Sequence, residues 1–231
     1  MKIQKWYSVW IRITFVVVLL ALTTLSLVTA PKAHADGPVR IMPLGASITE
    51  GLFSSDGGGY RTQLFRHLRD TGYNTTFVGS SADGPDDISR NHEGHSGFTI
   101  SGIANNVDGW LDQNPPDIIL LHVGTNDLLM GADPNGAADQ LNALIDRITA
   151  HVPNATLVIA QIIPVAGFED QTQVYNAAIA SIVQPKGDHV RLVNMYDVVQ
   201  ESELRDGVHP TDYGYDLMGD AWYQAVTPLL S

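Results

Sequence analysis

The stretch DIILLHV, residues 117–123, indicates the fold class. Four successive apolar residues lie at its centre, whereas a strand with one face in water alternates apolar and polar side chains. An unbroken apolar strand is typical of a parallel sheet that helices cover on both faces. The polar segment GTND follows directly, at residues 124–127. We therefore predict an internal parallel strand with polar groups at its carboxyl end.

Similar short runs, rich in Val, Ile and Leu, occur on both sides of this stretch and alternate with longer amphipathic segments. The predicted strands are 39–44, 75–78, 117–123, 156–162 and 190–195. The predicted helices are 60–71, 100–113, 136–151, 171–183 and 212–230. This alternation predicts βαβ units in an α/β protein. We expect a three-layer α/β/α sandwich whose five parallel strands have the flavodoxin-like order 2-1-3-4-5.

The first 35 residues have the pattern of an export signal. Lys2, Lys5 and Arg12 form a basic start, an apolar run covers residues 13–30, and AHA at 33–35 is a small-x-small cleavage site. The alternative is an uncleaved membrane anchor, because the apolar run approaches the length that spans a bilayer. We predict that residues 1–35 are a signal peptide and that residues 36–231 form one secreted, extracellular domain without membrane association.

The composition excludes several classes of binding partner and of active site. Without the signal peptide the chain keeps nine Lys and Arg against 25 Asp and Glu, a net charge of −16. Such a surface repels nucleic acid and anionic membranes, and it suits a neutral substrate. The absence of cysteine excludes a thiol nucleophile, a disulfide framework and a cysteine-ligated zinc site. We expect a monomer with no nucleic-acid partner.

The segment GASITEG, residues 45–51, follows the first predicted strand. A serine held in a turn at a strand's end has an exposed hydroxyl, so Ser47 is a candidate nucleophile. The alternative is an ordinary helix N-cap, for which serine is a usual choice. The segment is not the G-x-S-x-G elbow of α/β-hydrolases, because Thr49 stands in the place of the second glycine.

Two further segments carry candidate hydrogen-bond donors. Asn126 follows the third predicted strand, and its neutral amide can bind a developing oxyanion. The alternative for Asn126 is a simple turn. Gly97 ends the long predicted loop 79–98, where it can present a backbone N–H or merely turn the chain.

The segment DGVHP, residues 206–210, lies just before the last predicted helix. Its three-residue spacing lets one turn place the Asp206 carboxylate against the His209 ring. The carboxylate would fix the tautomer of the ring, and the other ring nitrogen could then take a proton from Ser47. A capping pair or a surface pair is the alternative explanation of this spacing.

Together these segments resemble the SGNH (GDSL-like) hydrolase superfamily over essentially the whole mature chain. Residues 45–49 resemble its first motif, Gly97 its second, residues 124–127 its third and residues 206–209 its fifth. The family usually has G-D-S, whereas here Ala46 replaces the Asp. That Asp is not a triad member, so the replacement puts only the hydrogen bonding of the turn in doubt.

The resemblance implies a serine esterase. Its catalytic triad would be Ser47, Asp206 and His209, and its oxyanion hole would combine Ser47, Gly97 and Asn126, without metal or organic cofactor. The segments IMPLGASIT at 41–49 and HEGHSG at 92–97 are most similar to carbohydrate esterase family 3, the acetyl xylan esterase type. The expected substrate is a small ester or an acetylated polysaccharide, and xylan is the first choice.

Two alternatives for the function remain open at this point. One is an SGNH lipase, lysophospholipase or thioesterase that acts on longer acyl chains, because it would share every catalytic residue. The other is a non-catalytic carbohydrate-binding protein that has kept the fold. Phe53, Tyr60 and Phe168 are candidates to line a sugar site.

Two groups of potential metal ligands are present in the sequence, but we do not predict a metal site at either. His92, Glu93 and His95 lack the H-E-x-x-H spacing of a zinc site. The carboxylates of Asp83, Asp86 and Asp87 are oxygen ligands of the kind that bind calcium, but we favour a solvated acidic loop. His122, at the end of a buried strand, is expected to be a hydrogen-bonded core residue, and Trp110 is expected to pack in the core.

Overall fold

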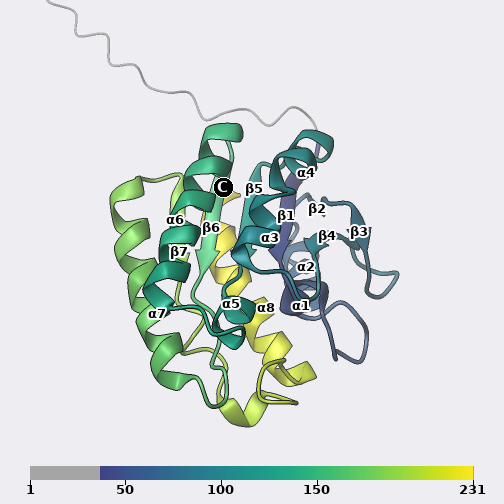
Figure 1. Ribbon diagram of the computed structural model, residues 1–231. Helices are drawn as coiled ribbons and strands as arrows, with labels where there is room; N and C mark the ends of the chain where they lie inside the picture. Colours follow the sequence, from purple (N-terminus) through teal and green to yellow (C-terminus); the bar gives the residue numbers. More distant parts are fainter. Residues whose placement is uncertain (1–36, 231) are drawn as a thin grey trace, which may run out of the picture. The chain divides into compact units, whose positions relative to one another are not determined.

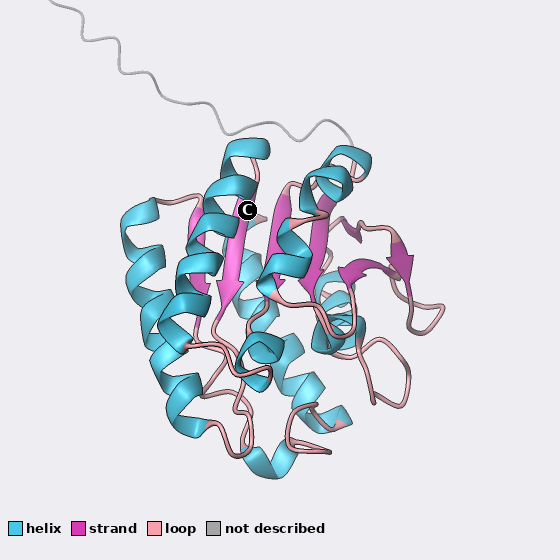
Figure 2. Cartoon of the chain, viewed as in Figure 1, coloured by secondary structure: helices cyan, strands magenta, loops and turns pink. Residues whose placement is uncertain are grey.

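The structure is a computed structural model that describes residues 37–230. The predicted signal peptide lies outside the described residues, so it stays a prediction. Across residues 37–230, every helix is too short or too polar to cross a membrane. Figures 1 and 2 show a central sheet with helices on both of its faces, which confirms the predicted three-layer α/β/α arrangement.

The centre of the sheet is β5 (Ile118–His122), the strand predicted from DIILLHV. It pairs in parallel with β1 (Val39–Gly45) on one side and β6 (Thr156–Ala160) on the other. Next to β6 lies β7 (Val190–Val193), and β2 (Thr75–Phe77) pairs with β1, both in parallel. The predicted order 2-1-3-4-5 of these strands is therefore confirmed.

The prediction of only five strands is wrong, because the sheet has seven. Within the predicted loop 79–98, β4 (Asn91–Gly94) pairs in parallel with the carboxyl end of β1, and β3 (Ser81–Ala82) pairs with β4 in antiparallel orientation. The short β2 pairs only with the amino-terminal part of β1, which leaves the rest of that edge for β4. The sequence of β4, NHEG, has no apolar run from which a strand could be predicted.

The unbroken apolar run in β5 serves two cores at once. Ile119 and Leu121 belong to one apolar cluster, while Ile118 and Leu120 belong to the cluster on the opposite face. Successive side chains of a strand point to opposite faces, so a sheet covered on both faces needs apolar residues at every position.

Two helical layers complete these cores. The first cluster is covered by α3 (Ile100–Ala104), α4 (Val107–Gln113), α6 (Pro134–His151) and α7 (Glu169–Val183). The second is covered by α2 (Tyr60–Asp70) and α8 (Asp212–Val226). The helix predicted at 100–113 is in fact two helices, α3 and α4, that a break at residues 105–106 separates.

Two short helices that were not predicted stand at the carboxyl ends of neighbouring strands. They are α1 (Ser47–Glu50), directly after β1, and α5 (Thr125–Leu129), two residues after β5 ends. In parallel α/β sheets, ligands bind beyond the carboxyl ends of the strands, near the point where the strand order reverses. Here the order reverses between β1 and β5. The fold therefore places α1 and α5, which carry the candidate segments, together at this edge (Figure 1).

Candidate active site

Ser47 is the first residue of α1, and the N-cap position belongs to Ala46. The interpretation of Ser47 as a helix cap is therefore wrong. Its side chain instead meets His209, with 2.9 Å between Ser47 Oγ and His209 Nε2. The turn needs glycine at position 45, because a Cβ there would lie 2.4 Å from the His122 carbonyl oxygen. The strand end and its tight turn thus present the Ser47 hydroxyl to an imidazole from a distant segment.

The other nitrogen of His209 is held by Asp206, with 2.9 Å between Nδ1 and Oδ2. The second carboxylate oxygen of Asp206 accepts the backbone N–H groups of Val208 and His209, at 3.0 and 2.8 Å. Asp206 is therefore both the cap of this turn and the partner of the ring. Since Nδ1 donates to the carboxylate, Nε2 is the nitrogen that can accept the proton of Ser47.

The carboxylate of Asp206 stays ionised in this arrangement. Partial burial opposes ionisation, but the hydrogen bonds from the His209 backbone and ring and from the Val208 backbone outweigh it and lower the pKa of Asp206 below its usual value. The side chains of His209 and Asp206 are 14% and 40% exposed. The acid–base pair is therefore partly exposed, whereas Ser47, which was predicted to have an exposed hydroxyl, is only 8% exposed.

Gly97 and Asn126 are linked by a hydrogen bond to Phe98, the residue after Gly97. Asn126 Nδ2 donates to the Phe98 carbonyl oxygen at 2.8 Å, which leaves its second amide hydrogen for a ligand. Gly97 is exposed with φ of 81°, inside a turn that the bond from Phe98 N to His95 O closes. That φ favours glycine, although a Cβ at Gly97 would meet no atom within 4 Å.

Two hydrogen-bonded ties fix the Gly97 turn to the segment of the serine. The backbone N–H of His95 donates to the Gly45 carbonyl oxygen at 3.1 Å. The Glu50 carboxylate, three residues after Ser47, accepts the backbone N–H of Ser96 at 2.9 Å and also its hydroxyl. The structure thus joins the segments of the predicted triad and of the predicted oxyanion hole at one edge of the sheet.

Similarity to known proteins identifies the family of the chain. Residues 44–217 match the GDSL-like Lipase/Acylhydrolase family. The chain belongs to this family. The resemblance to the SGNH (GDSL-like) superfamily drawn from the motifs is therefore confirmed.

Several relatives of this GDSL-like protein have names that specify an activity. A family 3 carbohydrate esterase from Clostridium thermocellum is 38% identical, with a TM-score of 0.77 over 84% of this chain and 97% of that chain. A serine-to-alanine mutant of an acetyl esterase, solved with an acetate ion, is 27% identical, with a TM-score of 0.74 over 83% of this chain and 98% of that one. The first of these structures confirms the similarity to carbohydrate esterase family 3.

A third relative is much longer than this chain. It is a multidomain esterase from Ruminococcus flavefaciens, 33% identical over 90% of this chain. The chain spans 31% of that protein's length. The comparison therefore concerns one part of the relative.

In this GDSL-like protein the three residues considered for zinc support the Gly97 turn. Glu93 is fully buried, and its carboxylate accepts the backbone N–H and hydroxyl of Ser80 and pairs with His95 Nε2 at 2.9 Å. The His95 ring also stacks on Trp110, with 4.4 Å between ring centroids and 12° between planes. His92 Nδ1 accepts the backbone N–H of Gly94 at 3.0 Å. Each of these side chains is engaged in holding the turn.

The acidic loop is tied down in the same way. The carboxylates of Asp83, Asp86 and Asp87 face three different partners, and these are His92, Arg90 and Arg66 in that order. Because the three carboxylates diverge, the loop is held by separate pairs along its length. The prediction that the protein needs no cofactor stays a prediction.

Of the three aromatic candidates for a sugar site, Phe53 borders the triad. Its ring lies edge-on to the His209 ring, with centroids 5.2 Å apart, and the residue is 45% exposed. Its φ of 68° is unusual for a residue with a side chain and costs on the order of 1 kcal/mol. Tyr60, in contrast, is fully buried, and burial raises its pKa to about 12. Phe168 is half-buried at the start of α7.

Arg61 is a supporting residue that the sequence analysis missed. It is fully buried in α2, and its guanidinium donates to five backbone carbonyls. Two of these acceptors, the carbonyls of Thr49 and Glu50, belong to the helix that begins with Ser47. The others are the carbonyls of Gly57, Asp83 and Arg90. No sequence signal distinguishes this arginine from an exposed one on an amphipathic helix.

Two buried histidines resist protonation. Burial lowers the pKa of His92 to about 4, with the charge of Arg61 acting in the same direction, and burial lowers that of His122 to about 4. His122 was expected to be hydrogen-bonded, but its Nε2 finds no partner among residues 37–230. For this nitrogen the expectation is wrong.

We expect acid to destabilise the protein before its carboxylates titrate. Below pH 6.5 the unfolded chain binds a proton at His92 that the folded chain takes up only near pH 4, so the free energy of unfolding falls across this window. The expected loss from His92 alone is about 1–2 kcal/mol between pH 6.5 and 5. Urea unfolding at both pH values should show a smaller loss for His92→Gln than for the wild type. Equal losses would contradict the assignment.

Proposed function

We propose that this protein is a serine esterase that removes acetyl groups from carbohydrate, with xylan or a related polysaccharide as the substrate. The observation that carries the proposal is the chain of short contacts from Ser47 through His209 to Asp206. Family membership supports the same chemistry, since the matched family groups lipases and acylhydrolases.

The proposed reaction has two acyl transfers. Ser47 Oγ attacks the ester carbonyl while His209 Nε2 takes its proton. The bond between the acyl carbon and the sugar oxygen then breaks, His209 gives its proton to that oxygen to form the sugar hydroxyl, and acetyl-Ser47 remains. Water repeats the sequence, with His209 as the base, and releases acetate. Asp206 holds the ring and stabilises the imidazolium throughout.

The proposed oxyanion hole consists of the backbone N–H groups of Ser47 and Gly97 and the side chain of Asn126. The N–H of Ser47 is available because the first N–H groups of a helix have no partner within it. Such donors act by binding the negative charge that develops on the carbonyl oxygen. The hydrogen bond to Phe98 O orients the Asn126 amide in advance.

We expect Asn126→Ala to lower kcat by a factor of about 10²–10³, because one oxyanion donor is lost. The measurement is steady-state hydrolysis of 4-nitrophenyl acetate, and KM should change far less than kcat. Asn106→Ala is the matched control, since Asn106 Nδ2 also donates to a backbone carbonyl, that of Gly102 at 2.9 Å. An equal loss of kcat in both variants would count against the role of Asn126.

Three observations support a carbohydrate ester as the substrate. The solved relatives include a carbohydrate esterase and an acetyl esterase that was crystallised with acetate. Asp206 and His209 are partly exposed, so a polymer that lies on the surface can reach the acid–base pair. The acidic composition suits a neutral substrate and disfavours an anionic one, such as a phospholipid surface.

A substrate panel tests the proposal against its alternatives. We expect release of acetate from acetylated xylan, and activity on 4-nitrophenyl esters that falls steeply beyond acetyl or propionyl. Activity that rises toward octanoyl would favour a lipase, lysophospholipase or thioesterase. Binding of xylan without hydrolysis of any activated acetate ester would favour the non-catalytic alternative.

We also propose that the protein is exported and acts as a monomer outside the cell. The support is the basic start, apolar run and AHA cleavage site in residues 1–35. Sequencing of the amino terminus of the secreted protein should find Asp36 first. Retention of residues 1–35 in a membrane fraction would favour the anchor instead.

A further inference from the structure

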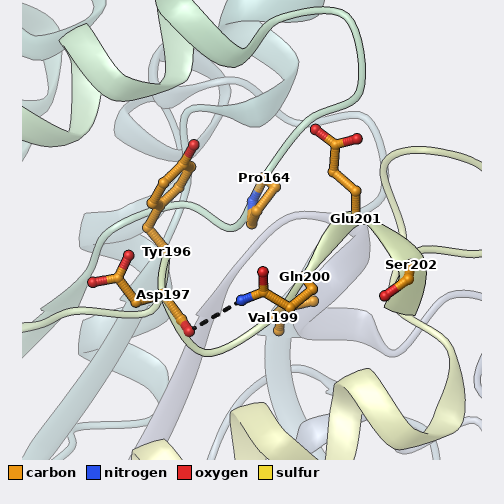
Figure 3. A pocket seen from close by; sticks show the side chains of 7 residues that line it. All are labelled: Pro164, Tyr196, Asp197, Val199, Gln200, Glu201 and Ser202. Carbon is orange, nitrogen blue, oxygen red and sulfur yellow. Dashed lines mark hydrogen bonds between the residues drawn. The ribbon is translucent and has the colours of Figure 1, made fainter.

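A pocket of about 430 Å³ is lined by residues that follow the carboxyl ends of β6 and β7 in the chain. Figure 3 shows these residues. Pro164 and Val199 are its buried apolar part, and Tyr196 is half-buried beside them. Gln200 and Glu201 are exposed on its rim. In Figure 3, Tyr196 and Glu201 stand on opposite sides of Pro164. The catalytic mechanism uses none of these residues.

The two segments that form this pocket are also the ones that hold the acid–base pair. Ala166 lies two residues after Pro164, and its backbone N–H donates to the Gly207 carbonyl oxygen at 2.8 Å. Gly207 stands between Asp206 and His209 in the sequence. The second segment runs from β7 through Gln200 directly into the turn that carries Asp206 and His209. The pocket therefore lies on the same edge of the sheet as the triad and is connected to it through backbone contacts.

The lining matches the chemistry of a sugar ring. A pyranose has an apolar face of C–H groups and a periphery of hydroxyls, and the pocket pairs a tyrosine ring, proline and valine with polar rim groups. The carboxylates of Asp197 and Glu201 can accept from hydroxyls, whereas the Gln200 side chain already accepts the backbone N–H of Glu203 and donates to the Asp197 carbonyl oxygen. None of the described residues that line it is Lys, Arg or His, so the pocket disfavours an anionic occupant.

We propose that this pocket is a remote subsite for a neutral sugar unit of the same polysaccharide whose acetyl ester is cleaved at Ser47. The inference rests on the proposed function and adds to it a length requirement on the substrate. A polymer bound along this edge occupies both places, whereas a small activated ester touches the triad alone. The binding energy of the distant unit then lowers KM for the polymer and leaves the chemistry on small esters unchanged.

The test compares two substrates in the protein that begins at Asp36. We expect Tyr196→Ala to raise KM for acetylated xylan about tenfold, because an aromatic contact is lost. Its kcat/KM for 4-nitrophenyl acetate should stay within about twofold of the wild-type value. Tyr73→Ala is the matched control, because Tyr73 lines a pocket of about 170 Å³ next to the amino-terminal residues of β1 and β2.

The outcomes separate the subsite from the proposed function. Unchanged kinetics of Tyr196→Ala on acetylated xylan overturn the subsite and leave the esterase proposal standing. Equal losses on both substrates also overturn it, because they indicate a structural effect. Failure of the wild type to deacetylate xylan while it hydrolyses 4-nitrophenyl acetate overturns the polysaccharide substrate itself.

A binding experiment supplies a second readout without catalysis. The inactive variant Ser47→Ala is titrated with deacetylated xylo-oligosaccharides of increasing length, and affinity is measured by calorimetry. We expect affinity to rise once the oligosaccharide is long enough to reach the pocket, and to lose that rise when Tyr196→Ala is added. A length dependence that the added substitution leaves intact overturns the subsite.

Discussion

Ser47→Ala and His209→Ala are each expected to lower kcat for 4-nitrophenyl acetate by a factor of about 10⁴ or more. The 2.9 Å contact between Ser47 Oγ and His209 Nε2 makes the two side chains one functional unit. Without the imidazole the hydroxyl has no base, and without the hydroxyl the imidazole has nothing to deprotonate. Steady-state kinetics with active-site titration measures the loss, and circular dichroism checks that the fold is kept.

The same unit predicts how the two substitutions combine. The double variant Ser47→Ala/His209→Ala should lose no more activity than the worse single variant, because residues that act as a unit have non-additive effects. Ser181→Ala is the matched control, since Ser181 is an exposed serine whose hydroxyl donates to the Ala177 carbonyl oxygen within α7. Substantial residual turnover in Ser47→Ala, or additive losses in the double variant, would assign the chemistry to another nucleophile.

The sequence predicts the strands and the place of the site because both depend on local patterns. Apolar residues at every position of β5 are needed to fill a core on each face, and this requirement is visible in DIILLHV. Polar segments at strand ends must meet at one edge in a parallel sheet. Ser47 and Asn126 were located by this reasoning, because they follow the neighbouring strands β1 and β5.

The features that the sequence does not predict are β4 and the hydrogen bonds that hold the Ser47 turn, because both depend on backbone groups. The strand β4 forms because β2 leaves part of the β1 edge free, and its NHEG sequence carries no periodic signal. The replacement at Ala46 left the hydrogen bonding of the turn in question, and the structure shows no side-chain cap there. Glu50 and Arg61 hold the turn instead, through bonds to Ser96 and to the carbonyls of α1.

Arg61→Met is expected to lower the free energy of unfolding by about 3–5 kcal/mol, which is the range for breaking a buried charged network. Its side chain is fully buried, and burial lowers the pKa of Arg61 to about 10. The guanidinium stays charged near neutral pH because this pKa lies well above 7. Five carbonyl oxygens accept its hydrogen bonds. Methionine fills similar space but leaves those carbonyls without their donor. Thermal unfolding should show a melting temperature lower by roughly 6–20 °C.

Arg66→Met separates this effect from the loss of any arginine in α2. Arg66 makes a two-pronged pair with Asp87 at 2.9 Å, but both side chains are more than 40% exposed, so its loss should cost no more than about 1 kcal/mol. Arg61→Lys keeps the charge and loses the forked geometry, so it should fall between the wild type and Arg61→Met. Because two of the carbonyls belong to α1, kcat below the melting temperature should fall for Arg61→Met and stay unchanged for Arg66→Met. Equal stabilities of the two methionine variants would show that the five carbonyls find other donors, and Arg61 would then have no part in holding Ser47.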